Sequence, residues 1–175
     1  MNAPPAPGIR ALFGVYLLAL FTLPVGVSGQ EQGSAVTEAY FRAMAGHFQL
    51  PVEEVDIVSD WDLEAEEVPV VLFISSRAGM APDALIGLRR QGRSWRDVAL
   101  QAGLGMRSFH VALPQDEPLG MLDRVYGEFR TTSPHQWRRV ELTDPEIVDL
   151  VNLRVLSEVA EVPPLRVLRT REESG

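Results

Sequence analysis

Apolar residues recur at intervals of three and four positions through most of the chain, which is the spacing of one face of a helix. The longest series lies between residues 147 and 159, and another lies between residues 34 and 49. Alternation with a period of two, which a half-buried strand requires, is short everywhere. The pattern therefore predicts an all-α fold with little or no sheet.

Proline and glycine residues divide this pattern into short helices. Residues 112–140 contain three prolines and two glycines, so we expect a loop-rich segment there, with one set of helical turns at residues 121–129. We predict that the helices pack as an orthogonal bundle forming a single domain at residues 30–175. The other predicted helices cover residues 34–49, 52–61, 63–78, 82–91, 95–102, 144–162 and 165–171.

Two capping boxes mark helix starts, in Ser94-Trp-Arg-Asp97 and in Thr143-Asp-Pro-Glu146. In such a box a hydroxyl accepts a hydrogen bond from the backbone of the acid, and the acid's side chain reaches back to the first residue. The second box opens the helix with the strongest apolar pattern. We therefore expect it to fix the start of the main core helix.

A weak internal repeat links three tracts of the chain. In each tract an aliphatic residue precedes one or two prolines, and a Val or Leu follows the aliphatic residue by five positions. We interpret the tracts as three helix–Pro-turn–helix units on one core. The alternative is that proline is simply common at helix starts. The tracts begin at Leu50-Pro51, Met80-Ala81-Pro82 and Val162-Pro163-Pro164.

The first 29 residues have the pattern of a secretory signal. Arg10 precedes thirteen residues without a charge, Pro24 ends that run, and short residues follow up to Gly29. A membrane-spanning helix usually needs about 20 apolar residues. We therefore expect cleavage after Gly29, a mature chain that starts at Gln30, and export to the periplasm. The alternatives are an uncleaved anchor in the inner membrane and a buried core helix.

Overall charge limits the partners of this chain. The sequence has 16 arginines, no lysine, 24 acidic residues and a formal net charge of −8. Removal of residues 1–29 takes away one arginine, which leaves 15 arginines against 24 acids, or −9. This balance argues against a polyanion held by overall charge. The absence of cysteine excludes disulfides, thiolate metal sites and a cysteine nucleophile.

The charges are segregated along the chain. Residues 53–67 hold eight acids and no base, whereas residues 77–107 hold six arginines and two acids. One interpretation makes the arginines a basic face for an anionic envelope polymer or a lipid surface. The interpretation that we favour pairs the arginines with the acidic tract, within one molecule or between two.

The most specific motif lies at residues 88–113. A Gly-x-Ser sequence at residues 92–94 opens a first helix, and the small residue Ala99 permits close approach of a second helix. Gly103 suits a left-handed turn between the two helices, and Phe109 supplies a large apolar residue in the second helix. The spacing predicts two short helices that pack closely across a turn.

This segment resembles the helix-turn-helix of resolvase, transposase and sigma-factor proteins, over about 26 of the 175 residues. It departs from that family at Gly105 and Met106, which weaken the start of the second helix, and at Pro114, which follows its early end. The resemblance implies a DNA-binding alternative, with the second helix in the groove. The other interpretation is a structural helical corner. The candidate anion or nucleic-acid contacts in the DNA-binding alternative are Arg89, Arg90, Arg93, Arg96, Arg107, Ser108 and His110.

Signals of catalysis are few. The histidines, His47, His110 and His135, stand 63 and 25 residues apart, and none belongs to a His-Glu-x-x-His motif. The chain has no Gly-x-Ser-x-Gly sequence around a nucleophile. We therefore predict no catalytic residue, no cofactor and no metal ligand.

The leading hypothesis is an exported structural or protein-interaction module whose partner is an unknown protein or envelope component. The overall pattern resembles exported bacterial all-α proteins of uncharacterised function, and this resemblance implies no activity. The runner-up is a helix-turn-helix protein with an uncleaved membrane anchor, and an enzyme is third. An interaction module should gather aromatic or apolar surface at residues 104–140. A DNA-binding protein should leave the arginines of residues 89–107 free of acidic partners, and an enzyme should gather His110, His135 and acids in one pocket.

Overall fold

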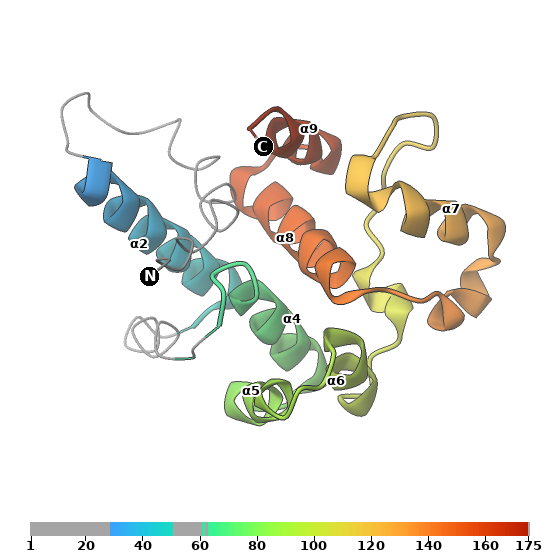
Figure 1. Cartoon of the computed structure of the whole chain (residues 1–175), viewed down its shortest axis with the longest axis horizontal. Coiled ribbons are helices and arrows are strands. Elements are labelled where there is room, and N and C mark those ends of the chain that lie inside the picture. The colour runs from blue at the N-terminus through green and yellow to red at the C-terminus, as the bar shows by residue number, and fades with distance from the viewer. Residues whose placement is uncertain (1–28, 51–60, 62, 175) are drawn as a thin grey trace, which may run out of the picture.

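The computed structural model describes residues 29–50, 61 and 63–174, and every regular element within them is helical (Figure 1). The α-helices are α2 (Gly29–Phe48), α4 (Val68–Ala78), α5 (Pro82–Arg90), α6 (Trp95–Gln101), α7 (Asp123–Thr131), α8 (Asp144–Ala160) and α9 (Pro164–Ser174). Three 3-10 helices complete these elements: η3 (Met106–Phe109), η4 (Gly120–Leu122) and η5 (Pro134–Arg139). This arrangement confirms the all-α prediction, while the orthogonal crossing of the helices stays a prediction.

Several sequence predictions lie outside the described residues. The predicted secretory signal covers residues 1–29, of which only Gly29, the first residue of α2, is described. The predicted helix at residues 52–61 is described only at Trp61, which is buried in a turn. The first Pro-turn tract likewise continues beyond Leu50 into residues that are not described.

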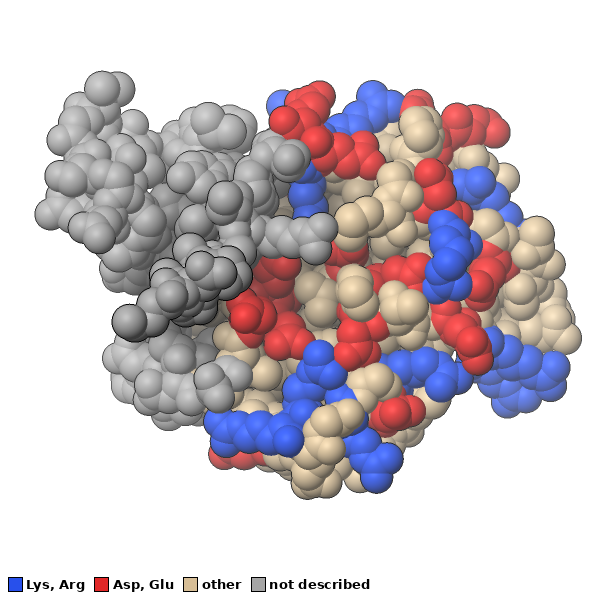
Figure 2. All heavy atoms as spheres, in the orientation of Figure 1, with Lys and Arg blue, Asp and Glu red and all other residues tan. Residues whose placement is uncertain are grey.

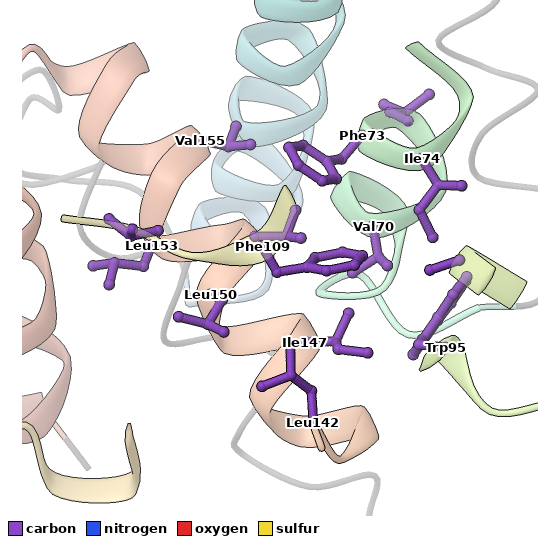
Figure 3. Close-up of a cluster of buried hydrophobic side chains, with 14 of the residues drawn as sticks. Val70, Phe73, Ile74, Trp95, Phe109, Leu142, Ile147, Leu150, Leu153 and Val155 are labelled. Atoms are coloured by element: carbon purple, nitrogen blue, oxygen red, sulfur yellow. The ribbon is translucent and has the colours of Figure 1, made fainter. Parts of the chain in front are cut away.

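Helix α8 lies at the centre of the fold, where it packs against α2, α4, α6, α9 and η3 (Figure 1). In Figure 3, Phe109 of η3 lies between α8 and α4, with Leu150 on one side and Val70 on the other. The ring of Phe109 also contacts Phe73 of α4, with 5.4 Å between the ring centroids. Full burial of each such side chain contributes about 1.5–3 kcal/mol. The core therefore ties η3 to the two most apolar helices.

Both predicted capping residues hold the helices that they begin. Thr143 and Glu146 form the complete box, with Thr143 N donating to Glu146 Oε2 over 2.9 Å and Glu146 N donating to Thr143 Oγ1 over 3.4 Å. Ser94 Oγ accepts a hydrogen bond from Asp97 N over 3.1 Å. The expected return bond from Asp97 does not form among the described residues, because Asp is one methylene shorter than the usual Glu.

Helix boundaries differ from the prediction where proline sets the start. Helix α4 begins at Val68 rather than at residue 63, because Pro69 fits the first turn of a helix and a separate turn at residues 64–67 precedes it. Helix α5 begins with Pro82, as predicted, and α9 begins with Pro164, one residue before the predicted start. Helix α2 begins earlier than predicted, at Gly29, and α9 extends three residues further, to Ser174.

The loop-rich segment at residues 112–140 is more helical than predicted. It holds η4, α7 and η5, and only the parts around these elements are irregular. Leu122, Val125, Tyr126 and Phe129 are all buried, and their spacing of three, one and three positions forms one helical face. The prediction of mostly loop was wrong because buried apolar residues outweigh the flanking prolines and glycines.

Candidate functional site

Arg89 lies at the end of α5, inside a cluster of opposite charges. Its Nε and Nη2 donate to Glu67 Oε1 over 3.2 and 2.8 Å, and its Nη1 donates to Asp144 Oδ2 over 2.6 Å. The guanidinium also lies 4.9 Å from the ring centre of Trp95. Trp95 Nε1 donates to Glu67 Oε1, and Trp95 N donates to Asp144 Oδ1, each over 2.8 Å. These four residues, the Arg89 cluster, join the starts of α4, α6 and α8 to the end of α5.

Arg89 keeps its positive charge inside this cluster. Burial lowers the pKa of Arg89, but hydrogen bonds and charge from Glu67 and Asp144 raise it more, so the net pKa lies above its ordinary value. Arg89 was predicted as a phosphate contact in the DNA-binding alternative. Its donors instead meet carboxylates of this chain, so Arg89 is not free of acidic partners. This pairing agrees with the interpretation that arginines of this stretch neutralise the acidic tract.

The other arginines of α5 and α6 divide between internal and external roles. Arg90 Nη2 donates to the carbonyl oxygen of Trp61 over 3.2 Å. Arg93 is exposed, and its backbone rather than its guanidinium makes the contacts: its carbonyl accepts from Arg89 Nη1 over 2.9 Å and its N donates to the carbonyl of Leu88 over 3.3 Å. Arg96 is half-buried, and its Nε has no hydrogen-bond partner within the described part of the chain. Together with Arg89, these arginines therefore do not form one continuous face with a shared role.

The helix-turn-helix resemblance fits the first helix and the turn but not the second helix. Ala99 is fully buried, and Gly103 adopts φ 82°, the left-handed turn that glycine favours. The second element is η3, a 3-10 helix of four residues in which Met106 and Phe109 point into the core. The backbone is extended at His110, so the second helix ends at Phe109 and does not continue as a recognition helix.

His110 lies in a cluster of aromatic rings. Its ring centroid is 4.3 Å from that of Trp137 with 30° between the ring planes, and 4.8 Å from that of Phe129. Tyr126 completes the group at 5.7 Å, and its hydroxyl donates to the carbonyl oxygen of Val111 over 2.6 Å. These contacts bring together η3, α7 and η5. An interaction module was expected to gather aromatic surface at residues 104–140, whereas Tyr126 and Phe129 are buried and His110 and Trp137 are half-buried.

Burial, together with two nearby cations, lowers the pKa of His110. Burial lowers the pKa of His110 below its ordinary value of 6.5, and the positive charges of Arg154 and Arg107 lower it further. Arg154, on α8, also donates from Nη2 to the carbonyl oxygens of His110 and Ser108, over 2.7 and 3.3 Å. The imidazole is therefore neutral at pH 7, and the predicted contact Ser108 serves a structural bond through its backbone.

Three arginines lie on the 3-10 helices η3 and η5, next in sequence to this aromatic cluster. Arg107, Arg138 and Arg139 are exposed, and their guanidinium groups form no ion pair or hydrogen bond within the residues that the structure describes. Helix η3 packs against η5, and a Cβ placed on Gly105 would lie 3.6 Å from Cβ of Arg138. We call Arg107, Arg138 and Arg139, with the half-buried rings of His110 and Trp137, the η3–η5 surface.

Sequence reasoning found one part of this surface and missed another. Arg107 and His110 are among the contacts that the sequence predicts, but Arg138 and Arg139 are not. Their signal is a stretch from residue 129 to 140 that holds two aromatic residues and three arginines but no acid. Because the sequence predicts a loop there, it does not indicate that these arginines lie near those of residues 77–107.

The described residues were expected to bring His110 and His135 together only if the protein were an enzyme. Within residues 29–50, 61 and 63–174, no group of three or more His, Asp or Glu side chains is placed to hold a metal ion. His135 is exposed on η5, whereas His110 is packed against aromatic rings. What the η3–η5 surface can do is bind: guanidinium groups take bidentate carboxylates or phosphates, and aromatic rings supply rigid contact area.

Comparisons with known proteins give no relative from which a function could be inferred. None of the helices in the described ranges is long and apolar enough to cross a membrane. No protein-family model, curated protein or solved structure matches this chain.

Proposed function

We propose that this chain is an exported helical domain that acts by binding another protein through the η3–η5 surface. The carrying observation is that three exposed arginines without partners in the described part of the chain lie on η3 and η5, two elements that pack together and whose neighbouring rings His110 and Trp137 are in contact. Arginine and aromatic residues are enriched at the energetic centres of protein interfaces. The proposal assigns no catalysis to the domain.

Export is supported by the sequence of residues 1–29, with its apolar run, proline and short residues before Gly29. The periplasm is the location that this signal favours. An uncleaved inner-membrane anchor is the alternative. The DNA-binding alternative requires a cytoplasmic domain and a recognition helix, and the four-residue η3 and the paired Arg89 do not support it.

Site-specific photocrosslinking in cells that express the full chain tests the interaction. A photoreactive residue replaces exposed His135 on η5, and the matched control replaces exposed Ala84 on α5. We expect one discrete crosslinked protein from position 135 and none from position 84. Equal adducts from both positions, or none from either, would contradict the proposal.

The same cells test export. Fractionation and mass spectrometry of the intact protein should give a soluble periplasmic product that starts near Gln30. An intact Met1 in the inner membrane would instead support the anchored alternative and would return DNA binding to consideration.

A further inference from the structure

We infer that the η3–η5 surface binds an acidic segment of a partner protein, with Asp or Glu carboxylates placed on Arg107, Arg138 and Arg139. This inference rests on the proposed function and adds the chemistry of the partner. It also assigns distinct tasks to the parts of the surface. The arginines supply the charge, and the contact between the His110 and Trp137 rings holds η3 and η5 together.

The first argument is the contrast in pairing among the arginines of the chain. Arg89, Arg124, Arg169 and Arg171 each form ion pairs with acids of this chain. The three arginines of the η3–η5 surface have no such pair within the described residues, although the chain as a whole carries 24 acids against 16 arginines. The exposed Arg93 and Arg166 also form no ion pair within the described residues, but they lie on separate segments. The η3–η5 surface instead brings three such arginines onto two packed 3-10 helices, where an acidic partner can supply the missing carboxylates.

The second argument is that the surface is held in place before any partner arrives. Trp137 Nε1 donates to the carbonyl oxygens of Phe129 and Thr132, over 3.0 and 2.9 Å, which anchors η5 to α7. Arg154 holds the backbone of η3 through the carbonyl oxygens of Ser108 and His110. A surface fixed in this way loses less entropy when it binds, because its backbone is already ordered.

The third argument decides between a protein and an extended polyanion. Figure 2 shows acidic side chains interspersed with arginines over most of this face, and arginines gathered along its lower edge and at the end below α7. A nucleic acid or an anionic membrane is large enough to meet those acidic side chains as well, and the net charge of −8 repels it. A short acidic segment contacts the arginines alone. The guanidinium fork also matches a carboxylate in two parallel hydrogen bonds.

The experiment measures binding of a fluorescein-labelled oligoglutamate peptide to the purified full chain by fluorescence anisotropy at low salt. The test variant is Arg107→Gln/Arg138→Gln/Arg139→Gln. The control is Arg93→Gln/Arg166→Gln, which removes two exposed arginines that also lack partners within the described residues. We expect about tenfold weaker binding for the test variant and less than about a twofold change for the control. Binding by the wild type should weaken as salt rises.

Several outcomes would overturn the inference. These are no binding by the wild-type protein, equal loss in both variants, or tighter binding to phosphatidylglycerol vesicles or to a single-stranded oligonucleotide than to the peptide. Self-association of the wild type that the test variant loses would assign the surface to a second copy of the chain. If crosslinking at position 135 succeeds while the peptide does not bind, the interaction stands and the acidic partner is wrong. Peptide binding without any crosslink would instead leave the proposed function unsupported in cells.

Discussion

The Arg89 cluster and the η3–η5 surface use the same residue type in opposite ways. Both draw on the arginine-rich stretch of residues 77–107. Arg89 meets Glu67 and Asp144, which lie 22 and 55 residues away in sequence, and its side chain is 25% exposed. Arg107 is exposed and has no ion pair within the described part of the chain. The comparison shows that a basic stretch in the sequence is not a basic surface until its long-range partners are known.

The two regions should also differ in energy. Removing one partner from a buried ion pair typically costs about 3–5 kcal/mol, because the other charge remains desolvated. Exposed pairs contribute about 0–1 kcal/mol. The Arg89 cluster lies between these limits, and the η3–η5 arginines have no intramolecular pair to lose. Stability measurements can therefore separate structural arginines from binding arginines.

The largest effect is expected from Arg89→Met. This change removes both ion pairs and leaves Glu67 and Asp144 partly buried without their cation. We expect the free energy of unfolding to fall by about 2–3 kcal/mol, less than for a fully buried pair because water reaches the site. Urea denaturation followed by circular dichroism measures this loss.

The matched control is Arg93→Met, which alters an exposed arginine four residues further along. Its unfolding free energy should stay within about 0.5 kcal/mol of the wild type. A similar loss in both variants would show that the Arg89 ion pairs do not carry the stability assigned to them.

A second paired arginine extends the comparison to pH. Glu146 is nearly buried and accepts hydrogen bonds from Arg124 Nε over 2.9 Å and from Thr143 N over 2.9 Å. Burial raises the pKa of Glu146, but the hydrogen bonds from Arg124 and Thr143 lower it more, so it lies below its ordinary value of 4.5. We expect Glu146→Gln to destabilise the protein by about 1 kcal/mol at pH 7, through loss of the cap and the ion pair.

The sign of the pH dependence follows from this depressed pKa. The stability that ionised Glu146 contributes is fully present above its unfolded pKa, and it is lost as pH falls through the folded pKa, below 4.5. The difference between wild type and Glu146→Gln should therefore shrink in acid. The exposed Asp116→Asn serves as control, and a difference that stays constant down to strong acid would contradict the assignment.

Local signals in the sequence predicted local structure. The apolar spacing of α8 and the Thr143 box gave the main helix nearly to its ends, because a capping box joins residues three positions apart. Gly103 was placed correctly in a left-handed turn, since few other residues tolerate that conformation. These features depend on neighbours in the chain, and the sequence contains all of them.

Long-range contacts account for what could not be predicted. The partners of Arg89 come from the starts of α4 and α8, and nothing in the sequence connects them with the end of α5. The contact of His110 with Trp137 depends on η3 packing against η5. The sequence predicts a loop where η5 lies and therefore gives no sign of this packing. Met106 shows the same limit. The local motif implied a recognition helix at this position, whereas Met106 is buried in the core within a 3-10 helix of four residues.

A smaller effect concerns the charge of His110. Because its folded pKa lies below 6.5, neutral His110 contributes stability that is fully present above the unfolded pKa and is lost as pH falls through the folded pKa. NMR titration of the imidazole should give a midpoint below 6.5 in the wild type. In Arg107→Gln the midpoint should move upward, because one neighbouring positive charge is gone. An unchanged midpoint would place the Arg107 charge too far away to act on the ring.

The smallest effect on stability is expected from the variant that should matter most for binding. Arg107→Gln/Arg138→Gln/Arg139→Gln breaks no ion pair within the described residues, and glutamine keeps much of the apolar stem of each side chain. We expect its unfolding free energy to stay within about 0.5 kcal/mol of the wild type, measured by the same urea denaturation as Arg89→Met. A slight stabilisation is also consistent, because neighbouring positive charges repel one another. A loss as large as that of Arg89→Met would mean that these arginines support the fold, and the contrast between structural and binding arginines would then fail.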